Sequence, residues 1–294
     1  MKRTIFLKYL ASALLTISTS FALADNYPSK PIKAIVPFAP GSATDQIGRA
    51  FAAKMAESLG QPVVVENRPG ANGMIGADVV AKSPADGYTL LFGTNSTNAA
   101  LKSLVKNLPY NQDTAFTPIG YFGSVPLIVA INNDVPAKSL NGFVSIAKAN
   151  PGKMTFAYAS TSQRVSSEIL ASVTGIKMTG VSYKSGPNAM TDLIGGQIQF
   201  TFDTNVAALP MLRAGKVKAI GVTSAHRLAD FPQVPAIAEA LPGFDFSSWY
   251  GLFGPAGMPP ELADRFAQAT REALTTPAMR ERFKSEGLLV MNSQ

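Results

Sequence analysis

Two loops rich in hydroxyl side chains carry the clearest chemical signal in the sequence. Residues 38–45 and residues 158–164 each follow a short apolar run and precede a helical pattern. A helix N-terminus leaves backbone N–H groups unpaired and carries the positive end of the helix dipole, so it accepts a carboxylate or phosphate. Gly41 lets the backbone approach a ligand closely, and Ser42 and Thr44 supply hydroxyls. Either loop alone reads as ordinary helix capping, but the pair predicts two anion sites that could hold the two ends of a dicarboxylate.

Several kinds of chemistry are excluded by the residues that the chain does not contain. It has no cysteine and one histidine, His226, which excludes disulfides, thiolate or multi-histidine metal sites and cysteine nucleophiles. Neither a G-x-S-x-G elbow nor a phosphate loop occurs, and the glycines of residues 70–76 have the wrong spacing for a dinucleotide loop. His226 is interpreted as a polar residue at a strand end. The remaining catalytic alternative is an acid/base pair, Asp45 and Asp203, facing each other across a cleft.

Composition and charge argue for a folded protein that does not bind nucleic acid. The chain has 294 residues, of which 46% are apolar and 15% are charged, and its formal net charge is +7. Nucleic-acid binders gather Lys and Arg on one face or stripe, whereas here these residues are scattered. A modest positive field still favours anionic small molecules.

The first 24 residues have the pattern of a cleavable signal peptide. Lys2, Arg3 and Lys8 form a basic start, residues 9–23 are mostly apolar, and Ala22-Leu23-Ala24 supplies the small-x-small cleavage pattern. The apolar run is shorter than the roughly 20 residues that a membrane span needs. We therefore expect export to the periplasm with cleavage after Ala24.

The elements that must position the two loops form an alternating pattern. Short β-rich runs alternate with helical patterns, which predicts an α/β fold built from βα units around mainly parallel sheets. Two blocks of such units predict two lobes with a ligand cleft between them. Candidate crossings lie at residues 117–126 and 224–247, which gives a discontinuous first lobe of residues 25–122 plus 225–294 and a second lobe of residues 123–224. The expected strands cover residues 32–36, 63–65, 88–92, 127–131, 154–158, 197–202, 217–222 and 246–253, with one more beginning at 181.

A series of ordered motifs between residues 27 and 288 resembles one known family, the Bug-type extracytoplasmic solute receptors, which are the binding proteins of tripartite tricarboxylate transporters. The stretches that carry the resemblance are Tyr27-Pro28-Ser29-Lys30-Pro31-Ile32, Val36-Pro37-Phe38-Ala39-Pro40-Gly41, Val65-Glu66-Asn67-Arg68-Pro69-Gly70-Ala71, Ala85-Asp86-Gly87-Tyr88-Thr89-Leu90-Leu91, Tyr183-Lys184, Asp192-Leu193-Ile194-Gly195-Gly196-Gln197 and Gly254-Pro255-Ala256-Gly257-Met258-Pro259.

The resemblance implies a type II periplasmic-binding-protein-like fold whose two lobes close on a small carboxylate. It implies that main-chain N–H groups and waters at the two loops hold the ligand, and that Asn95 and Ser96 belong to a further cleft loop. Asp203 resembles the family residue at the pocket floor, and Trp249 is expected either to cover the mouth or to lie in the core. The expected ligand-binding residues are Phe38, Ala39, Gly41, Ser42, Thr44, Asn95, Ser96, Ala159, Ser160, Thr161, Ser162, Arg164, Tyr183 and Asp203.

The chain departs from the family pattern at three places. Gly41-Ser42 stands where many relatives carry two glycines, which adds a hydroxyl and removes backbone freedom. Arg164 stands where the family often has a histidine. Because arginine binds carboxylates bidentately, Arg164 is expected either to favour a dicarboxylate or to lie on the surface. The chain ends at Gln294, about a helix short of family members, so the first lobe is expected to lack its last element.

These observations predict a periplasmic receptor for a small organic carboxylate. The ligand is expected to be a dicarboxylate, aliphatic or aromatic such as terephthalate, although tricarboxylates and amino acids fit the same backbone sites. The receptor would act as a monomer and deliver its ligand to the inner-membrane subunits of a tripartite transporter, without a cofactor, a metal or catalysis. The alternative is an exported enzyme that uses Asp45 or Asp203 as acid or base on a small carboxylate.

Overall fold

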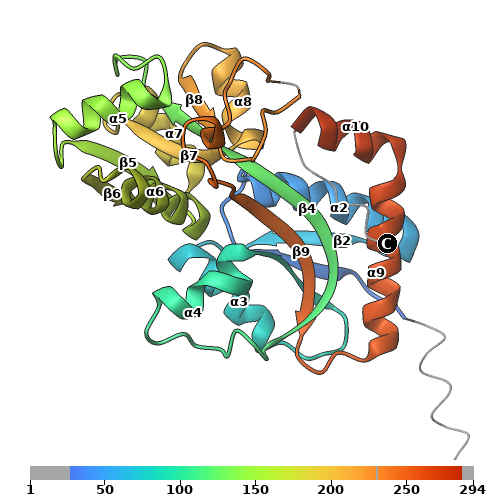
Figure 1. Cartoon of the computed structure of the whole chain (residues 1–294). Helices are drawn as coiled ribbons and strands as arrows, with labels where there is room; N and C mark the ends of the chain where they lie inside the picture. Colours follow the sequence, from blue (N-terminus) through green and yellow to red (C-terminus); the bar gives the residue numbers. More distant parts are fainter. Residues whose placement is uncertain (1–26, 230, 287–294) are drawn as a thin grey trace, which may run out of the picture.

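Two sheets that share one long strand form the frame of the protein. The computed structural model describes residues 27–229 and 231–286, in which nine strands are found (Figure 1). The shared strand is β4 (Phe116–Ile131), whose first part pairs with β9 (Ser247–Pro255) and whose last part pairs with β7 (Phe200–Thr204) and β8 (Lys218–Val222). The predicted signal peptide, residues 1–24, and the chain end at Gln294 lie outside the described residues.

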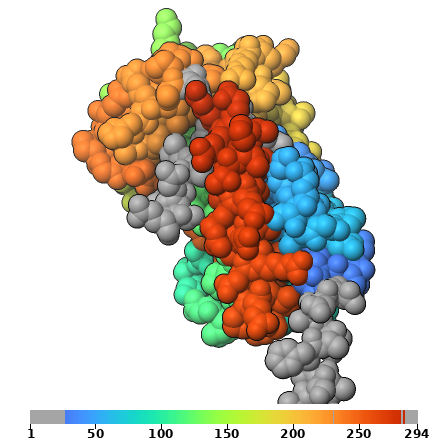
Figure 2. Space-filling model, turned by 90° about the vertical axis from the view of Figure 1, so that its right-hand side faces the viewer, coloured from blue at the N-terminus to red at the C-terminus, as the bar shows by residue number. Residues whose placement is uncertain are grey.

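The first sheet has the strand order β2-β1-β3-β9-β4. Its strands β1 (Ile32–Val36), β2 (Val63–Asn67) and β3 (Thr89–Thr94) are parallel, and β9 runs antiparallel to β3 and β4. One face is covered by α2 (Ala43–Leu59), α9 (Pro260–Thr275) and α10 (Pro277–Glu286), whose apolar side chains share one core. Figure 2 shows α9 and α10 as a continuous ridge beside α2 on this outer face. The other face is covered by α3 (Met74–Ala81).

The second sheet contains β6 (Met178–Ser182), β5 (Met154–Tyr158), β7, the end of β4, and β8. The strands β5, β6 and β7 are parallel, and β4 runs antiparallel to both β7 and β8, so four of its five strands run in one direction. Helices α5 (Leu140–Ala149) and α6 (Thr161–Thr174) contribute to one core, while α7 (Gly186–Ile194) and α8 (Asn205–Arg213) contribute to another. The predicted α/β architecture of two mainly parallel sheets flanked by helices is confirmed.

The β4 strand is much longer than the sequence predicts. Residues 117–126 contain two prolines and two glycines, which favoured a turn-rich crossing, but they form the first part of β4. The pairing with β9 shifts register between Pro118 and Gly120 and again between Tyr121 and Gly123. Such bulges accommodate residues that a regular ladder would reject, because proline has no N–H to donate. Residues 117–126 therefore form a strand and not a loop, and the predicted crossing between the lobes at this point stays a prediction.

The segment before β9 packs with the second sheet. Phe231, Val234 and Ile237 lie in the cores under β4 and β8, and Phe244 joins them. Residues 231–246 thus contact the second lobe, although the sequence boundary of 225 assigns them to the first. This packing favours a second crossing near the start of β9, and the lobe boundaries themselves stay a prediction. No helix among the described residues is long and apolar enough to cross a membrane.

Candidate functional site

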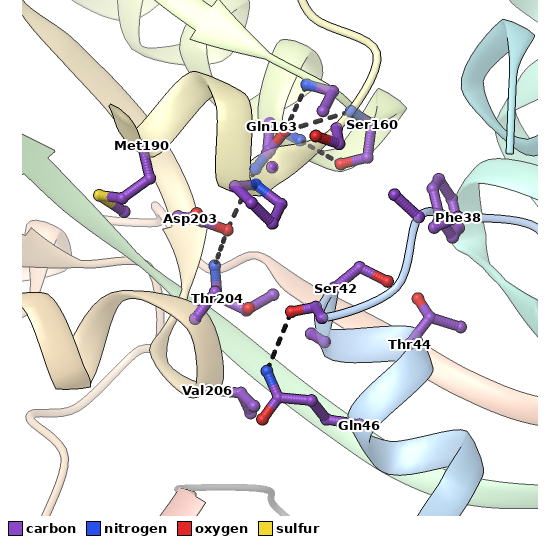
Figure 3. A pocket seen from close by; sticks show the side chains of 18 of the residues that line it. Phe38, Ser42, Thr44, Gln46, Ser160, Gln163, Met190, Asp203, Thr204 and Val206 are labelled. Carbon is purple, nitrogen blue, oxygen red and sulfur yellow. Dashed lines mark hydrogen bonds between the residues drawn. The ribbon is translucent and has the colours of Figure 1, made fainter. Parts of the chain in front are cut away.

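A cavity of about 410 Å³ lies where the two sheets meet. It is lined by the start of α2, the start of α6, the helices α7 and α8, the ends of β3 and β7, the interior of β4 and the start of β9. Its volume falls within the range of about 300–1,000 Å³ that small-molecule sites occupy. Figure 3 shows the cavity with Phe38, Ser42 and Thr44 on one side and with Met190, Asp203 and Val206 on the other.

Four helices begin at this cavity, and the cap residue of each lines it. Ser42, Ser160, Ser185 and Thr204 precede α2, α6, α7 and α8 respectively. The three serine hydroxyls accept hydrogen bonds from N–H groups of their own first turns at 3.3–3.4 Å. Each helix brings its unpaired N–H groups and the positive end of its dipole to the same space. The arrangement suits a small anion.

The backbone groups that can reach a ligand are fewer than the sequence suggests. The Gly41 N–H donates to Asp45 Oδ2 at 2.9 Å, while the N–H groups of Ala159 and Ser160 donate to Gln163 Oε1 at 2.6 and 3.1 Å. These groups hold the loops in shape. The cap serines accept one N–H from the first turn of α2, α6 and α7, so the N–H groups left for a ligand are the other ones of these first turns, which have no partner within the helix.

Asp45 is a buried structural anchor of the first loop and does not line the cavity. Its Oδ1 accepts hydrogen bonds from Arg49 Nε at 3.0 Å and from Asn67 Nδ2 at 2.8 Å, and its Oδ2 accepts the bond from Gly41. Burial raises the pKa of Asp45, but the hydrogen bonds from Arg49, Gly41 and Asn67 outweigh burial and hold the pKa below its ordinary value. The predicted acid/base pair is therefore not assembled across this cavity.

Asp203 stands at the end of β7 and lines the cavity floor. Its Oδ1 accepts hydrogen bonds from Thr204 N at 2.8 Å and from Gln163 Nε2 at 3.1 Å. Burial raises the pKa of Asp203 from 3.8 to about 6, and the two hydrogen bonds only partly oppose it. Asp203 is the single acidic side chain that lines the cavity among the described residues, and Lys184, which is exposed at the rim, is the single basic one.

Most of the predicted site residues meet at the cavity. Those that line it are Phe38, Ala39, Gly41, Ser42, Thr44, Ser96, Ala159, Ser160, Ser162 and Asp203. Whether these residues bind a ligand stays a prediction.

Four predicted residues lie behind the lining or away from it. Asn95 Oδ1 accepts hydrogen bonds from Ser162 Oγ at 2.9 Å and from Ser248 Oγ at 3.1 Å, so it ties the first lobe to the start of α6. Thr161 is buried, and its hydroxyl has no partner among the described residues. The Tyr183 hydroxyl donates to Asp192 Oδ2 at 2.7 Å.

The fourth of these residues, Arg164, points away from the cavity. Its guanidinium lies 5.5 Å from the centre of the Tyr158 ring and 3.9 Å from the carboxylate of Glu168, and its side chain is about half exposed. Of the two expectations for Arg164, the structure favours the surface position. Trp249 does not line the cavity either, and its ring centre lies 6.2 Å from that of Phe253.

Sequence reasoning missed several lining residues. Gln163 had a readable signal, because Ser160 and Gln163 form the S-x-x-Q capping box found in the structure. Ser248 and Tyr250 had none, since they reach the cavity from β9, far along the chain. Thr204 also lines the cavity, and its buried hydroxyl has no partner among the described residues.

A two-lobed α/β frame with a cavity between its sheets, at which four helices begin, is typical of small-molecule binding proteins. The family model described as "Tripartite tricarboxylate transporter family receptor" matches residues 47–294, and the chain belongs to this family. It is a periplasmic solute-binding protein by family and fold.

Solved structures of similar proteins agree with this assignment. The periplasmic binding protein BugD is 33% identical with a TM-score of 0.86, and the match covers 90% of this chain and 89% of BugD. MatC from Rhodopseudomonas palustris, solved with bound malate, is 34% identical with a TM-score of 0.87, over 91% of this chain and 92% of MatC. An R. palustris protein solved with adipate is 30% identical with a TM-score of 0.87, over 90% of this chain and 89% of that protein.

Proposed function

We propose that the protein captures a small dicarboxylate in the periplasm and delivers it to the membrane subunits of a tripartite transporter. The observation that carries this proposal is the meeting of four helix N-termini at one cavity. Malate in MatC and adipate in the R. palustris neighbour support a carboxylate ligand, since both similar proteins hold dicarboxylates.

Two features of the cavity favour a ligand with two acidic groups. The first turns of α2 and α6 come from different lobes and can each receive one carboxylate. Lys184 adds a positive charge at the rim, where no ion pair with an acidic side chain occupies it among the described residues. Lys184 can therefore neutralise the charge of a second ligand carboxylate at the rim, away from the negative charge of Asp203.

The chain's family and its N-terminal pattern support export and a role in transport. The basic start, the apolar run and the Ala22-Leu23-Ala24 motif would send the protein to the periplasm. There the ligand-bound receptor would dock on inner-membrane transporter subunits and act as a monomer.

Binding without turnover is the expected behaviour. Asp203 is the one acidic group at the cavity among the described residues, and Asp45 is held by three hydrogen bonds outside it. A general acid and a general base are thus not paired at this site.

A pair of aspartate substitutions tests the anion site. Ser42→Asp and Ser139→Asp both keep a good helix cap, because aspartate caps helices as well as serine does. Ser42 lines the cavity, whereas Ser139 caps α5 on the surface, where its hydroxyl accepts from Gly142 N at 3.1 Å. Only Ser42→Asp places a negative charge beside the ligand, so it should weaken carboxylate binding at least tenfold while Ser139→Asp leaves binding unchanged.

Calorimetric titration of the purified protein with succinate, adipate, malate and terephthalate supplies the measurement. A folded protein that binds none of these acids, or equal binding by the two variants, contradicts the proposal. Chromatography of each acid after incubation with the protein would reveal any product. A product would contradict the receptor function and support the alternative, an exported enzyme.

A further inference from the structure

The wall of the cavity that faces the hydroxyl-rich loop of α2 is apolar. Met190 on α7 lies across the cavity from Ser42 and Thr44 (Figure 3), and Val206 at the start of α8 lines the cavity where α8 packs against α2. Met190 is only 8% exposed and belongs to the core under α7 and α8, so its position is fixed by packing.

This apolar wall continues along both helices, away from their N-termini. Residues four apart lie on one face of a helix, so Ile194 follows Met190 on α7 and Pro210 follows Val206 on α8. Both, together with Met211, line the cavity. The α7–α8 wall, defined as Met190, Ile194, Val206, Pro210 and Met211, thus leads outward from the anion-binding end.

Ile194 shows that the wall is open to a ligand. Its side chain is 36% exposed although it lines a cavity, and apolar surface left open at a cavity marks a place where a ligand's apolar surface is expected. Apart from Thr191, the residues that line the cavity on α7 and α8 beyond their first turns are apolar or alanine. A ligand hydroxyl pressed against this wall would lose water and find few partners.

We propose that the α7–α8 wall is an apolar subsite that receives the hydrocarbon body of the ligand and selects long-chain or aromatic carboxylates over short hydroxylated ones. The inference rests on the proposed function, because the helix N-termini must first hold the carboxylate. The apolar subsite predicts that the preferred ligand of this receptor is an acid such as adipate or terephthalate, and not malate or citrate.

A homologous series of acids measures the subsite directly. Succinate, adipate and suberate carry the same charges and differ only in methylene number. Full burial of a methylene contributes about 0.8 kcal/mol, which is about fourfold in affinity, so partial burial predicts a two- to fourfold gain for each added methylene. Malate and citrate should bind more weakly than adipate.

Two substitutions on the wall should reduce the gain in affinity for each added methylene. Ile194→Ser and Met211→Ser remove apolar surface at partly exposed positions where folding is little affected. Both should reduce suberate affinity about five- to tenfold and leave succinate affinity within twofold. Val173→Ser is the matched control, because Val173 is a 57% exposed apolar residue on α6 that does not line the cavity.

The outcomes separate this inference from the function on which it rests. Equal affinities along the series, or tighter binding of malate than of adipate, would overturn the apolar subsite. So would a loss of suberate affinity in Val173→Ser as large as that in the two wall variants. Each of these results would leave the proposed carboxylate receptor unaffected. A folded protein that binds no acid of the series would overturn both.

Discussion

Ionised Asp203 is expected to destabilise the folded protein at neutral pH, and replacing it by asparagine should reveal the cost. The side chain is 6% exposed at the end of β7 and accepts hydrogen bonds from Thr204 N and Gln163 Nε2 at one oxygen. Asparagine can accept both bonds with its amide oxygen and carries no charge to bury. Asp203→Asn should therefore keep the local structure and remove the penalty.

The size of the effect follows from the pKa of Asp203. Burial raises this pKa from 3.8 to about 6. Each pKa unit corresponds to about 1.4 kcal/mol, so the ionised side chain lowers the free energy of unfolding by about 3 kcal/mol at pH above about 7. The folded state binds the proton more tightly than the unfolded state, so this loss is absent below about pH 4 and grows as the pH rises through about 6.

Urea unfolding of the wild type and the variant between about pH 4 and pH 8 measures this difference. Asp203→Asn should gain up to about 3 kcal/mol over the wild type at pH 8, equivalent to a Tm rise of roughly 6–12 °C, and nothing at pH 4. Asp45→Asn should show the opposite behaviour. The pKa of Asp45 is held below its ordinary value, so this carboxylate stabilises the fold at neutral pH and the contribution disappears as the pH falls.

The exposed Asp264 on α9 provides the matched control, because Asp264→Asn changes the same charge on the surface. A difference between Asp203→Asn and the wild type that does not change with pH, or a variant that is less stable at pH 8, would refute the reasoning.

Three further substitutions test separate parts of the site. Arg164→Ala should leave carboxylate affinity within about twofold by calorimetry, because the guanidinium lies over an aromatic ring outside the cavity lining; a tenfold loss would place it on the ligand. Asn95→Ala should lower the unfolding free energy by about 1–3 kcal/mol, since two serine hydroxyls lose their shared acceptor, and an unchanged urea midpoint would show that this contact is dispensable. Gly41→Ala should cost about 1–2 kcal/mol, because Gly41 has φ +80°, and a Tm equal to that of the wild type would contradict the backbone strain.

The sequence predicted a strand or helix well wherever residues next to it in the chain mark where it begins and ends. The apolar runs of β1 and β5 were predicted with the observed limits, Ile32–Val36 and Met154–Tyr158. The loops before α2 and α6 were recognised as helix starts because a helix N-terminus has a short-range signature, and the structure identifies Ser42 and Ser160 as their cap residues.

Long-range pairing explains what the sequence could not provide. The first part of β4 has the composition of a loop, and only the partner strand β9 makes it a strand. Arg164 lies one turn into α6, and the sequence alone could not decide between the cavity and the surface for it. Asn95 was assigned to the ligand, yet its partners Ser162 and Ser248 are 67 and 153 residues away.

The uninterrupted course of β4 determines how the two lobes can move. A hinge made of loops would swing freely, whereas this connection consists of strands held by a ladder of hydrogen bonds up to Pro126 and, beyond it, from Leu127 onward. Opening the cavity would bend and twist that ribbon. Movement of the lobes is therefore expected to be a bending of the paired strands and not a free rotation about a flexible loop.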